Sequence, residues 1–400
     1  MIAAQTVVFL VPITPADGGN GLAMRAGMLL DALASHAAVH VVVVPVSGPR
    51  DEPSWAESRA RSVAVVQPVT AGSAKEHLTR QLADPRLRTR LECSAPLPAR
   101  ATLAPPTLVS EIADALPVGL GQPDAVVALR TYLAPLGITL ARHLRAHRVV
   151  VDADDDDAAV LQQLGKHDEA AASERLARCW LPDADAVLAA SALDAAGLAH
   201  RARLVRVDVV PNAVAIPGGV TRAPGNGHLL FVGNLTYEPN VAAALLLVAE
   251  ILPIVRQRHP NATLDIVGAH DTRLDSLADA PGVHLTGWVP DVGPYYERAD
   301  VAVVPLRHGA GTRIKVLEAF AHRRAVVATP VAVAGLEVQP GRELEVAEEP
   351  RDVAGAIADL LADPARAARL VDAAAGLVAT RYSPASVAPR ARAAILGRRG

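Results

Sequence analysis

The sequence predicts an α/β protein made of two doubly wound, Rossmann-like domains that face each other across a cleft. The chain has 400 residues, which is long enough for two domains with separate cores. Short β-branched runs alternate with Ala- and Leu-rich helical stretches from end to end, and several runs are continuously apolar. Continuous apolar runs are typical of strands buried on both faces of a parallel sheet, and the alternation indicates doubly wound sheets. Residues 216–227, with four glycines and two prolines, interrupt the pattern and are expected to form a linker.

The runs before this linker predict an N-terminal domain over residues 1–215. The first expected strand is followed by a helix over residues 21–35. The strands expected in this domain are 6–11, 39–44, 63–66, 125–129, 148–152, 186–189 and 207–210.

The runs after the linker predict a C-terminal domain over residues 228–380. Its expected strands are 229–233, 264–268, 283–286, 301–305, 325–329 and 344–347, and its clearest helices are 241–258, 315–323 and 352–363. Residues 381–400 form a last helix that could pack back on the N-terminal domain. Parallel sheets bind ligands at the carboxyl ends of their strands, so functional residues are expected directly after strands.

Composition and charge exclude several classes of protein. With 39 basic and 42 acidic residues the net charge is −3, whereas nucleic-acid-binding domains are usually strongly basic. The apolar stretch 241–255 carries Glu250 and Pro253 and is shorter than the roughly 20 residues of a membrane span. The chain start lacks the basic region of a signal peptide. A cytoplasmic protein without nucleic-acid partners is therefore expected, with peripheral membrane contact left open.

The first candidate site is the glycine-rich segment DGGNG at residues 17–21, between a strand and a helix. Gly18 and Gly19 would let the backbone approach a ligand, and the helix start would favour an anionic group. The segment is not G-x-G-x-x-G, which disfavours a dinucleotide dehydrogenase. A plain strand-to-helix turn is the alternative.

The second candidate site follows the strand that ends at Pro305. A loop of small residues leads into a helix that carries Arg313, Lys315 and Glu318. Bases at a helix start oppose the helix dipole, so two of them there indicate an anionic ligand such as a phosphate. The alternative is a surface Lys–Glu pair three residues apart. His308, in the same loop, is a candidate contact to that ligand.

The third candidate site is an acidic run after the strand that ends near residue 151. Asp152, Asp154 and the three aspartates that follow would present carboxylates at the strand end. Asp152 and Asp154 are the carboxylates expected to bind hydroxyl groups of a ligand. A Mg²⁺ site and a favourable helix start are the alternatives, and no metal is expected.

Several stretches of the C-terminal half carry a family resemblance, which extends from about residue 229 to residue 336. In chain order they begin FVGNL at Phe231, YEPN at Tyr237, LDIVG at Leu264, LTGWVPD at Leu285, ADVAVVP at Ala299, GTRIKVLEA at Gly311, AVVATP at Ala325 and AGLE at Ala334. In this order and spacing they resemble the retaining nucleotide-sugar glycosyltransferases of family 4 (glycosyl transferases group 1), which have the GT-B fold. The N-terminal half agrees through the Gly18-Gly19 loop and through PNAV after residue 210.

The resemblance implies roles for individual residues. Glu318 matches the second glutamate of the family's E-x₇-E motif, which holds the ribose hydroxyls; a carboxylate accepts two such hydrogen bonds. The resemblance places Gly311 and Thr312 at the diphosphate through their amides, with Gly18 and Gly19 reaching it from the other domain. Trp288 and Val289 fall where the family contacts the base.

The chain also departs from the family pattern. The first glutamate of the motif falls on Ala310, and Gly233-Asn234 and Pro239-Asn240 stand where the family has basic phosphate ligands. Arg313 and Lys315 are the expected replacements for those cations.

Together these features predict a metal-independent hexosyltransferase acting in carbohydrate biosynthesis. It would transfer a sugar from a nucleoside-diphosphate donor to an acceptor hydroxyl with retention of configuration, using Arg313, Lys315 and Asp152 in catalysis and Asp154 to bind the acceptor. No cofactor is expected beyond the nucleotide sugar, with UDP favoured over GDP, and the acceptor could be a small molecule, a glycan or a lipid-linked sugar. A nucleotide-sugar epimerase on the same fold and a degenerate, partner-binding protein are the alternatives.

Overall fold

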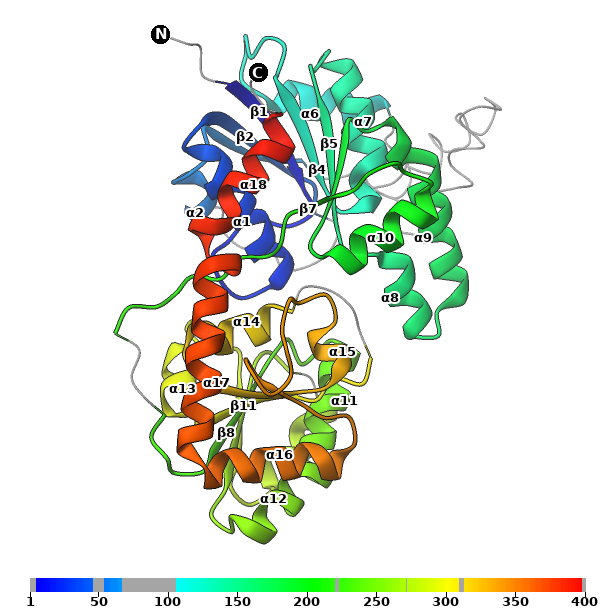
Figure 1. Cartoon of the computed structure of the whole chain (residues 1–400). Coiled ribbons are helices and arrows are strands. Elements are labelled where there is room, and N and C mark those ends of the chain that lie inside the picture. The colour runs from blue at the N-terminus through cyan, green and yellow to red at the C-terminus, as the bar shows by residue number, and fades with distance from the viewer. Residues whose placement is uncertain are drawn as a thin grey trace. The chain divides into compact units, whose positions relative to one another are not determined.

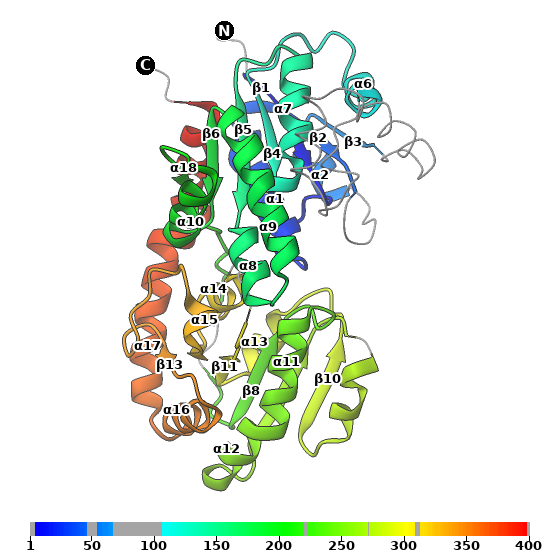
Figure 2. The ribbon, with the colours of Figure 1, turned by 90° about the vertical axis from the view of Figure 1, so that its right-hand side faces the viewer.

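The computed structural model describes residues 5–45, 54–66, 106–219, 223–270, 272–308 and 313–397. The chain forms two compact units. The first comprises Met1–Asn212 together with Val387–Gly400, and the second comprises Ala213–Ser386. Each unit is a parallel sheet with helices on both sides (Figure 1; Figure 2).

The described strands of the first unit form a seven-stranded parallel sheet in the order β3-β2-β1-β4-β5-β6-β7. The central strand β4 is continuously apolar and buried, and β1 is so from Val7 to Val11, as burial on both faces requires. The strands are β1 (Gln5–Val11), β2 (Ala37–Val43), β3 (Ser62–Val65), β4 (Ala125–Leu129), β5 (Val149–Asp154), β6 (Ala186–Ala189) and β7 (Asp208–Val209).

The helices of the first unit come mostly from the connections between its strands. They are α1 (Gly21–Ala34), α2 (Ser54–Glu57), α6 (Pro106–Ala115), η1 (Thr131–Leu133), α7 (Ala134–His143), α8 (Asp157–Gln163), α9 (His167–Trp180), η2 (Leu181–Asp183) and α10 (Ala192–Ala202). Most of the last helix, α18 (Pro384–Leu396), also belongs to this unit. Its buried residues Val387, Ala391 and Ile395 recur every four positions, so one face of the helix is covered.

The described strands of the second unit form a six-stranded parallel sheet in the order β10-β9-β8-β11-β12-β13. The order runs outward in both directions from the first strand, as it does in the first unit. The strands are β8 (His228–Val232), β9 (Thr263–Val267), β10 (Val283–Gly287), β11 (Val301–Val304), β12 (Ala325–Ala328) and β13 (Glu345–Val346).

The helices of the second unit include one continuous helix with a π-helical turn in its middle, and a long C-terminal pair. They are α11 (Glu238–Leu246), the π-helical η3 (Leu247–Ile251), α12 (Leu252–Arg258), η4 (Thr272–Asp279), α13 (Gly293–Arg298), α14 (Ile314–Ala321), α15 (Pro330–Val333), α16 (Pro350–Ala362), α17 (Pro364–Leu377) and the π-helical η5 (Val378–Tyr382).

The fold class predicted from the sequence is confirmed. Each strand expected in either half is present, with ends that agree to within two residues. The helix expected over residues 241–258 differs, because it starts at Glu238 and passes through the π turn at Leu247–Ile251. Pro253 follows this turn and has no N–H to donate, so the wider turn accommodates the missing hydrogen bond.

The continuous helix from Glu238 to Arg258 is long and apolar enough to cross a membrane by length and composition, with a mean hydropathy of 1.7. Half of its apolar window is buried within the chain, and Leu247, Ile251 and Val255 are fully covered. Its second half, η3 and α12, packs on α16.

Candidate functional site

The strand order of the second unit predicts a ligand site between β8 and β11. In an open parallel sheet, ligands bind beyond the carboxyl ends of the two neighbouring strands at which the order reverses. The loop after β8 starts with Gly233 and Asn234, and the loop after β11 runs through His308 towards α14. Residues predicted from the sequence to bind the donor therefore follow both strands of this pair.

Lys315 connects the two sides of this point. It lies on the first turn of α14, after β11, yet its Nζ donates a hydrogen bond of 2.7 Å to Oδ1 of Asn240 at the start of α11, after β8. The same Nζ lies 5.8 Å from the centre of the Phe231 ring on β8. The ammonium group therefore lies beside Asn240, in a segment where the family that the sequence resembles has basic phosphate ligands.

Asn240 holds the end of β8 in place. Its side chain is 5% exposed, and its Nδ2 donates to the backbone oxygen of Asn234 at 2.7 Å. A Cβ at Gly233 would lie 3.1 Å from this amide nitrogen, so the glycine allows close approach. The side chain of Asn234 turns back on its own loop and accepts from the N–H and hydroxyl of Thr236.

Burial changes the pKa values of both ionisable groups on this face of α14. Desolvation, with a smaller effect of the Arg313 charge, lowers the pKa of Lys315 to about 8, although Glu318 opposes the shift. Desolvation raises the pKa of Glu318 to about 7, against the attraction of Lys315. Both groups therefore change charge near neutral pH, which is common at functional sites.

The other donor-site residues predicted from the sequence lie around the same edge. Arg313 precedes α14 and its Nε donates to the backbone oxygen of Ala334 at 3.2 Å. Trp288 follows β10 and is 69% exposed, Val289 beside it is partly buried, and His308 is exposed. Gly311, Thr312 and Ala310 lie outside the described residues.

In the first unit, the predicted glycine-rich loop lies between β1 and α1. Gly18 and Gly19 are exposed, and Gly19 has a φ of +83°, a conformation that favours glycine. Asn20 caps α1 by accepting from the N–H of Leu22 at 2.8 Å.

Asp152, predicted as a catalytic residue, is fully buried and bound by an arginine that the sequence analysis did not single out. Arg25 on α1 donates to both of its oxygens at 2.7 Å and lies 3.2 Å from Oδ1 of Asp154. Arg25 also donates to the backbone oxygen of Val210 and to Oδ1 of Asn212, each at 3.0 Å. Burial lowers the pKa of Arg25, but the two carboxylates more than offset this and hold its pKa above the ordinary value.

Arg130, directly after β4, binds three aspartates of the acidic run. It donates to Asp154 at 3.1 Å, to Asp155 at 2.9 Å and to Asp157. Burial and the charge of Asp154 raise the pKa of Asp155, although Arg130 opposes the shift. Arg130 and Asp154 both have a positive φ, of 80° and 65°, and backbone strain of this kind often occurs at functional sites.

The acidic run is thus matched by arginines from neighbouring elements, including Arg201, which donates to Asp156 at 2.9 Å. Among the described residues, no three His, Cys, Asp or Glu side chains are grouped to hold a metal ion. The sequence did carry one signal for this network, because Arg25 is the one basic residue within the apolar helix α1.

Part of the chain matches a known protein family. Residues 226–363 match the model of the family "Glycosyl transferases group 1". A Klebsiella pneumoniae protein, described as an uncharacterized 44.6 kDa protein in the cps region, is 25% identical over 133 residues. That match covers 31% of this chain and about a third (34%) of the relative's length.

Solved structures extend the similarity to nearly the whole chain. Anabaena Alr3699/HepE, in complex with UDP and glucose, is similar with a TM-score of 0.68 and 15% identity over 96% of this chain and 98% of that chain. The TM-score is 0.71 for TarM at 11% identity (97% and 98%), and 0.68 for the sucrose-phosphate synthase of Thermosynechococcus elongatus at 16% identity (96% and 97%). The chain has the GT-B fold. It therefore combines a glycosyl transferases group 1 domain with GT-B architecture, as the resemblance implied.

Proposed function

We propose that this protein is a retaining glycosyltransferase of family 4 that transfers a sugar from a nucleoside-diphosphate sugar to an acceptor hydroxyl. The observation that carries the proposal is the position of Lys315, whose ammonium group reaches from α14 to Asn240 where the strand order reverses. The match of residues 226–363 to the group 1 glycosyltransferases covers this whole cluster.

In this proposal the donor binds to the second unit. Lys315 and Arg313 bind the diphosphate, Glu318 binds the ribose hydroxyls, and exposed Trp288 stacks on the base. UDP is the proposed nucleotide. HepE has been solved with UDP-glucose, and the trehalose-6-phosphate protein of E. coli with UDP-2-fluoro glucose, which supports this choice.

The proposed chemistry depends on stabilising the leaving diphosphate. Cleavage of the bond between sugar and diphosphate leaves negative charge on the phosphate oxygen, and a fixed cation in a partly buried site stabilises that charge as it develops. Lys315 is held for this task by Asn240. We assign acceptor recognition to the first unit, and we propose that no metal ion takes part.

The first experiment is calorimetric titration of the protein with UDP, GDP, ADP and dTDP. Selective binding of UDP is expected, and Glu318→Ala should reduce it, because hydrogen bonds to a charged group contribute about 1.5–3 kcal/mol. Glu348→Ala, an exposed glutamate of the same unit, is the matched control and should leave binding unchanged. Failure of all four nucleotides to bind would contradict the proposal and favour the partner-binding alternative.

Assays of turnover distinguish a glycosyltransferase from a nucleotide-sugar epimerase. Incubation with a UDP-sugar and an acceptor should release UDP and give a product whose anomeric proton coupling matches that of the donor. Excess EDTA should leave the rate unchanged. An isomerised sugar nucleotide formed without acceptor would instead identify an epimerase.

A further inference from the structure

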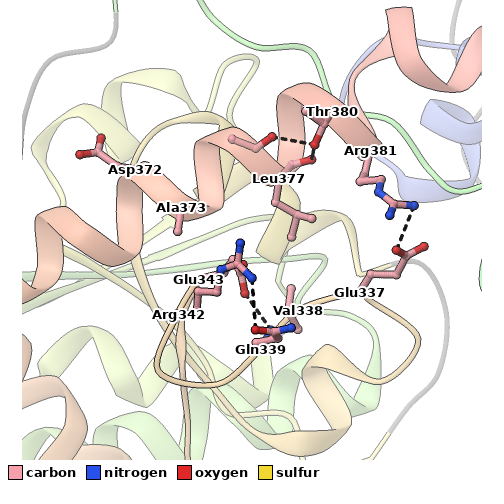
Figure 3. Close-up of a pocket in the computed structure, with 11 residues that line it drawn as sticks. Glu337, Val338, Gln339, Arg342, Glu343, Asp372, Ala373, Leu377, Thr380 and Arg381 are labelled. Carbon is pink, nitrogen blue, oxygen red and sulfur yellow. Dashed lines mark hydrogen bonds and ion pairs between the residues drawn. The ribbon is translucent and has the colours of Figure 1, made fainter.

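A cavity of about 710 Å³ lies in the second unit, between the end of α17 with η5 and the loop of residues 337–343 (Figure 3). It lies within the size range of small-molecule sites. It shares no residue with the proposed donor site.

Two ion pairs lie on the walls of this cavity. On one side Arg381 and Glu337 approach to 3.1 Å, and on the other Arg342 and Glu343 also approach to 3.1 Å. Asp372 stands at the rim, points away from the cavity in Figure 3 and pairs with Arg323. The charges that face the cavity are therefore balanced.

Glu343 is a buried residue that holds Arg342 and the backbone of Gln339 on one wall of the cavity. It is 5% exposed, its Oε2 accepts from the N–H of Gln339 at 2.8 Å, and its Oε1 holds Nε of Arg342. Nη1 of Arg342 in turn donates to Oε1 of Gln339 at 3.3 Å. The polar groups on this wall are thus positioned before a ligand arrives, which reduces the entropy lost on binding.

The depth of the cavity comes from small residues on α17. Ala373 and Gly376 face it, and a Cβ added at Gly376 would meet nothing within 4 Å. Leu377 and Val338 give the cavity an apolar strip between the two ion pairs.

These features select the chemistry of a ligand. An anion would meet Glu337 and Glu343, a cation would meet Arg342 and Arg381, and a zwitterion would have to break both ion pairs to find free charges. Hydroxyl groups need no such break, because paired carboxylates keep lone pairs and paired guanidinium groups keep N–H donors. A sugar also offers C–H faces that suit the apolar strip.

We propose that this cavity binds a neutral carbohydrate, separately from the donor site. The sugar hydroxyls bond to Arg342, Gln339 and Glu343 on one wall and to the Arg381–Glu337 pair on the other. The site would keep a glycan on the protein without taking part in bond cleavage. It does not depend on the proposed glycosyl transfer, because binding requires neither donor nor turnover.

Saturation-transfer NMR on the full chain tests this directly, with maltose, lactose and cellobiose as probes. At about 10 mM sugar, above the roughly millimolar dissociation constant expected of an open site, at least one disaccharide should receive saturation. Gly376→Phe fills the cavity and should reduce that signal at least fivefold. Gly355→Phe, on α16 and also free of neighbours within 4 Å, is the matched control and should retain it.

A second pair of variants covers the case in which Gly376→Phe does not fold. Arg342 is 65% exposed in its side chain, so Arg342→Ala should fold, and it should weaken the signal while Arg351→Ala does not. No saturation of any disaccharide would overturn the proposal. Equal saturation in wild type and both cavity variants, or saturation of glutamine in place of the sugars, would also overturn it.

Discussion

In the described part of the proposed donor site, Lys315 has one hydrogen-bond partner, Asn240, which leaves its remaining protons to a ligand. Replacement by alanine removes the cation without disturbing the fully buried side of α14. We predict that Lys315→Ala weakens UDP binding about 10- to 100-fold, as loss of hydrogen bonds to a charged group implies. Calorimetry measures the change, and Lys166→Ala, at an exposed lysine of the first unit, is the control. Equal affinity of the Lys315 and Lys166 variants would contradict the role of Lys315.

The shifted pKa values of the two α14 residues predict proton exchange on donor binding. UDP-glucose is the suitable ligand, because its diphosphate has no ionisation near pH 7. At pH 8 Lys315 is half protonated, and a bound diphosphate favours its charged form, so the complex should take up about half a proton. At pH 6 Glu318 is mostly protonated and ribose hydroxyls favour its carboxylate, so binding should release a proton.

Titrations in buffers of different ionisation enthalpy measure this exchange. Lys315→Ala should abolish uptake at pH 8 and keep release at pH 6, whereas Glu318→Gln should do the reverse. The same sign at both values of pH in the wild-type protein would contradict the assignment.

Loss of the Arg25 side chain is expected to reduce the stability of the fold strongly. Removal of one partner of a buried, bidentate ion pair leaves an uncompensated charge and costs about 3–5 kcal/mol. Arg25→Ala should therefore lower the free energy of unfolding by about that amount in urea denaturation. Arg59→Ala, which breaks an exposed pair with Asp31, should cost about 1 kcal/mol or less. Similar losses in the two variants would contradict this view of Arg25.

At the scale of single residues, the sequence pointed to candidate residues but did not show which residues contact one another. Lys315 was selected with Arg313 because two bases are unusual at the start of a helix, and Glu318 was selected from the family resemblance; the roles of these residues stay predictions. Arg25 was missed because its main partner, Asp152, is 127 residues away, and a sequence does not show pairs that only tertiary packing brings together. The aspartates of the acidic run were read as ligands for the same reason, since their arginines come from α1, β4 and α10.

At the scale of elements, the ends of β8 and β9 approach each other so closely that only glycine fits. A Cβ at Gly268 would lie 1.8 Å from the backbone oxygen of Gly233, and Gly268 has a φ of +144°. Gly268→Ala must therefore displace the Gly233–Asn234 turn that Asn240 holds.

We predict that Gly268→Ala lowers the free energy of unfolding by at least about 1–3 kcal/mol, the usual cost of a strained φ. It should also weaken UDP binding, because Asn240 is bonded to the displaced turn and Lys315 is bonded to Asn240. Gly218→Ala is the control, since its Cβ would meet nothing within 4 Å. Urea denaturation and calorimetry measure the two effects, and an unchanged affinity in a destabilised variant would separate the turn from the donor site.

The elements themselves were well predicted because buried parallel strands leave a strong local signal. Continuous runs such as 125–129 need no tertiary information to be recognised. The π turn at Leu247–Ile251 was not predicted, because Pro253 alone does not determine whether a helix ends, kinks or widens.

At the scale of the whole molecule, the division into two units separates residues that are neighbours in sequence. Helix α17 belongs to the second unit, whereas most of α18 belongs to the first. Two long-range bonds hold α18 there: Arg148 donates to the backbone oxygen of Ala394 at 3.1 Å, and Arg392 donates to that of Ala32 at 3.4 Å. The sequence predicted this helix but left open which domain it joins. The pattern of its apolar residues does not show which surface the helix packs against.

This division predicts how local stability is distributed, which amide hydrogen exchange measures peptide by peptide. Arg25→Ala destabilises the first unit, so exchange should accelerate in peptides from β1 and β5 and also in the peptide over residues 387–397. Peptides from α17 should be unaffected. A ligand that binds only the folded second unit stabilises that unit, by about 2.7 kcal/mol at 100 times its dissociation constant. UDP should therefore slow exchange in β8 and α14 and leave residues 387–397 unchanged in both wild type and variant. If residues 387–397 instead followed α17 in either experiment, α18 would belong energetically to the second unit, and the two bonds to Arg148 and Ala32 would contribute little to its stability.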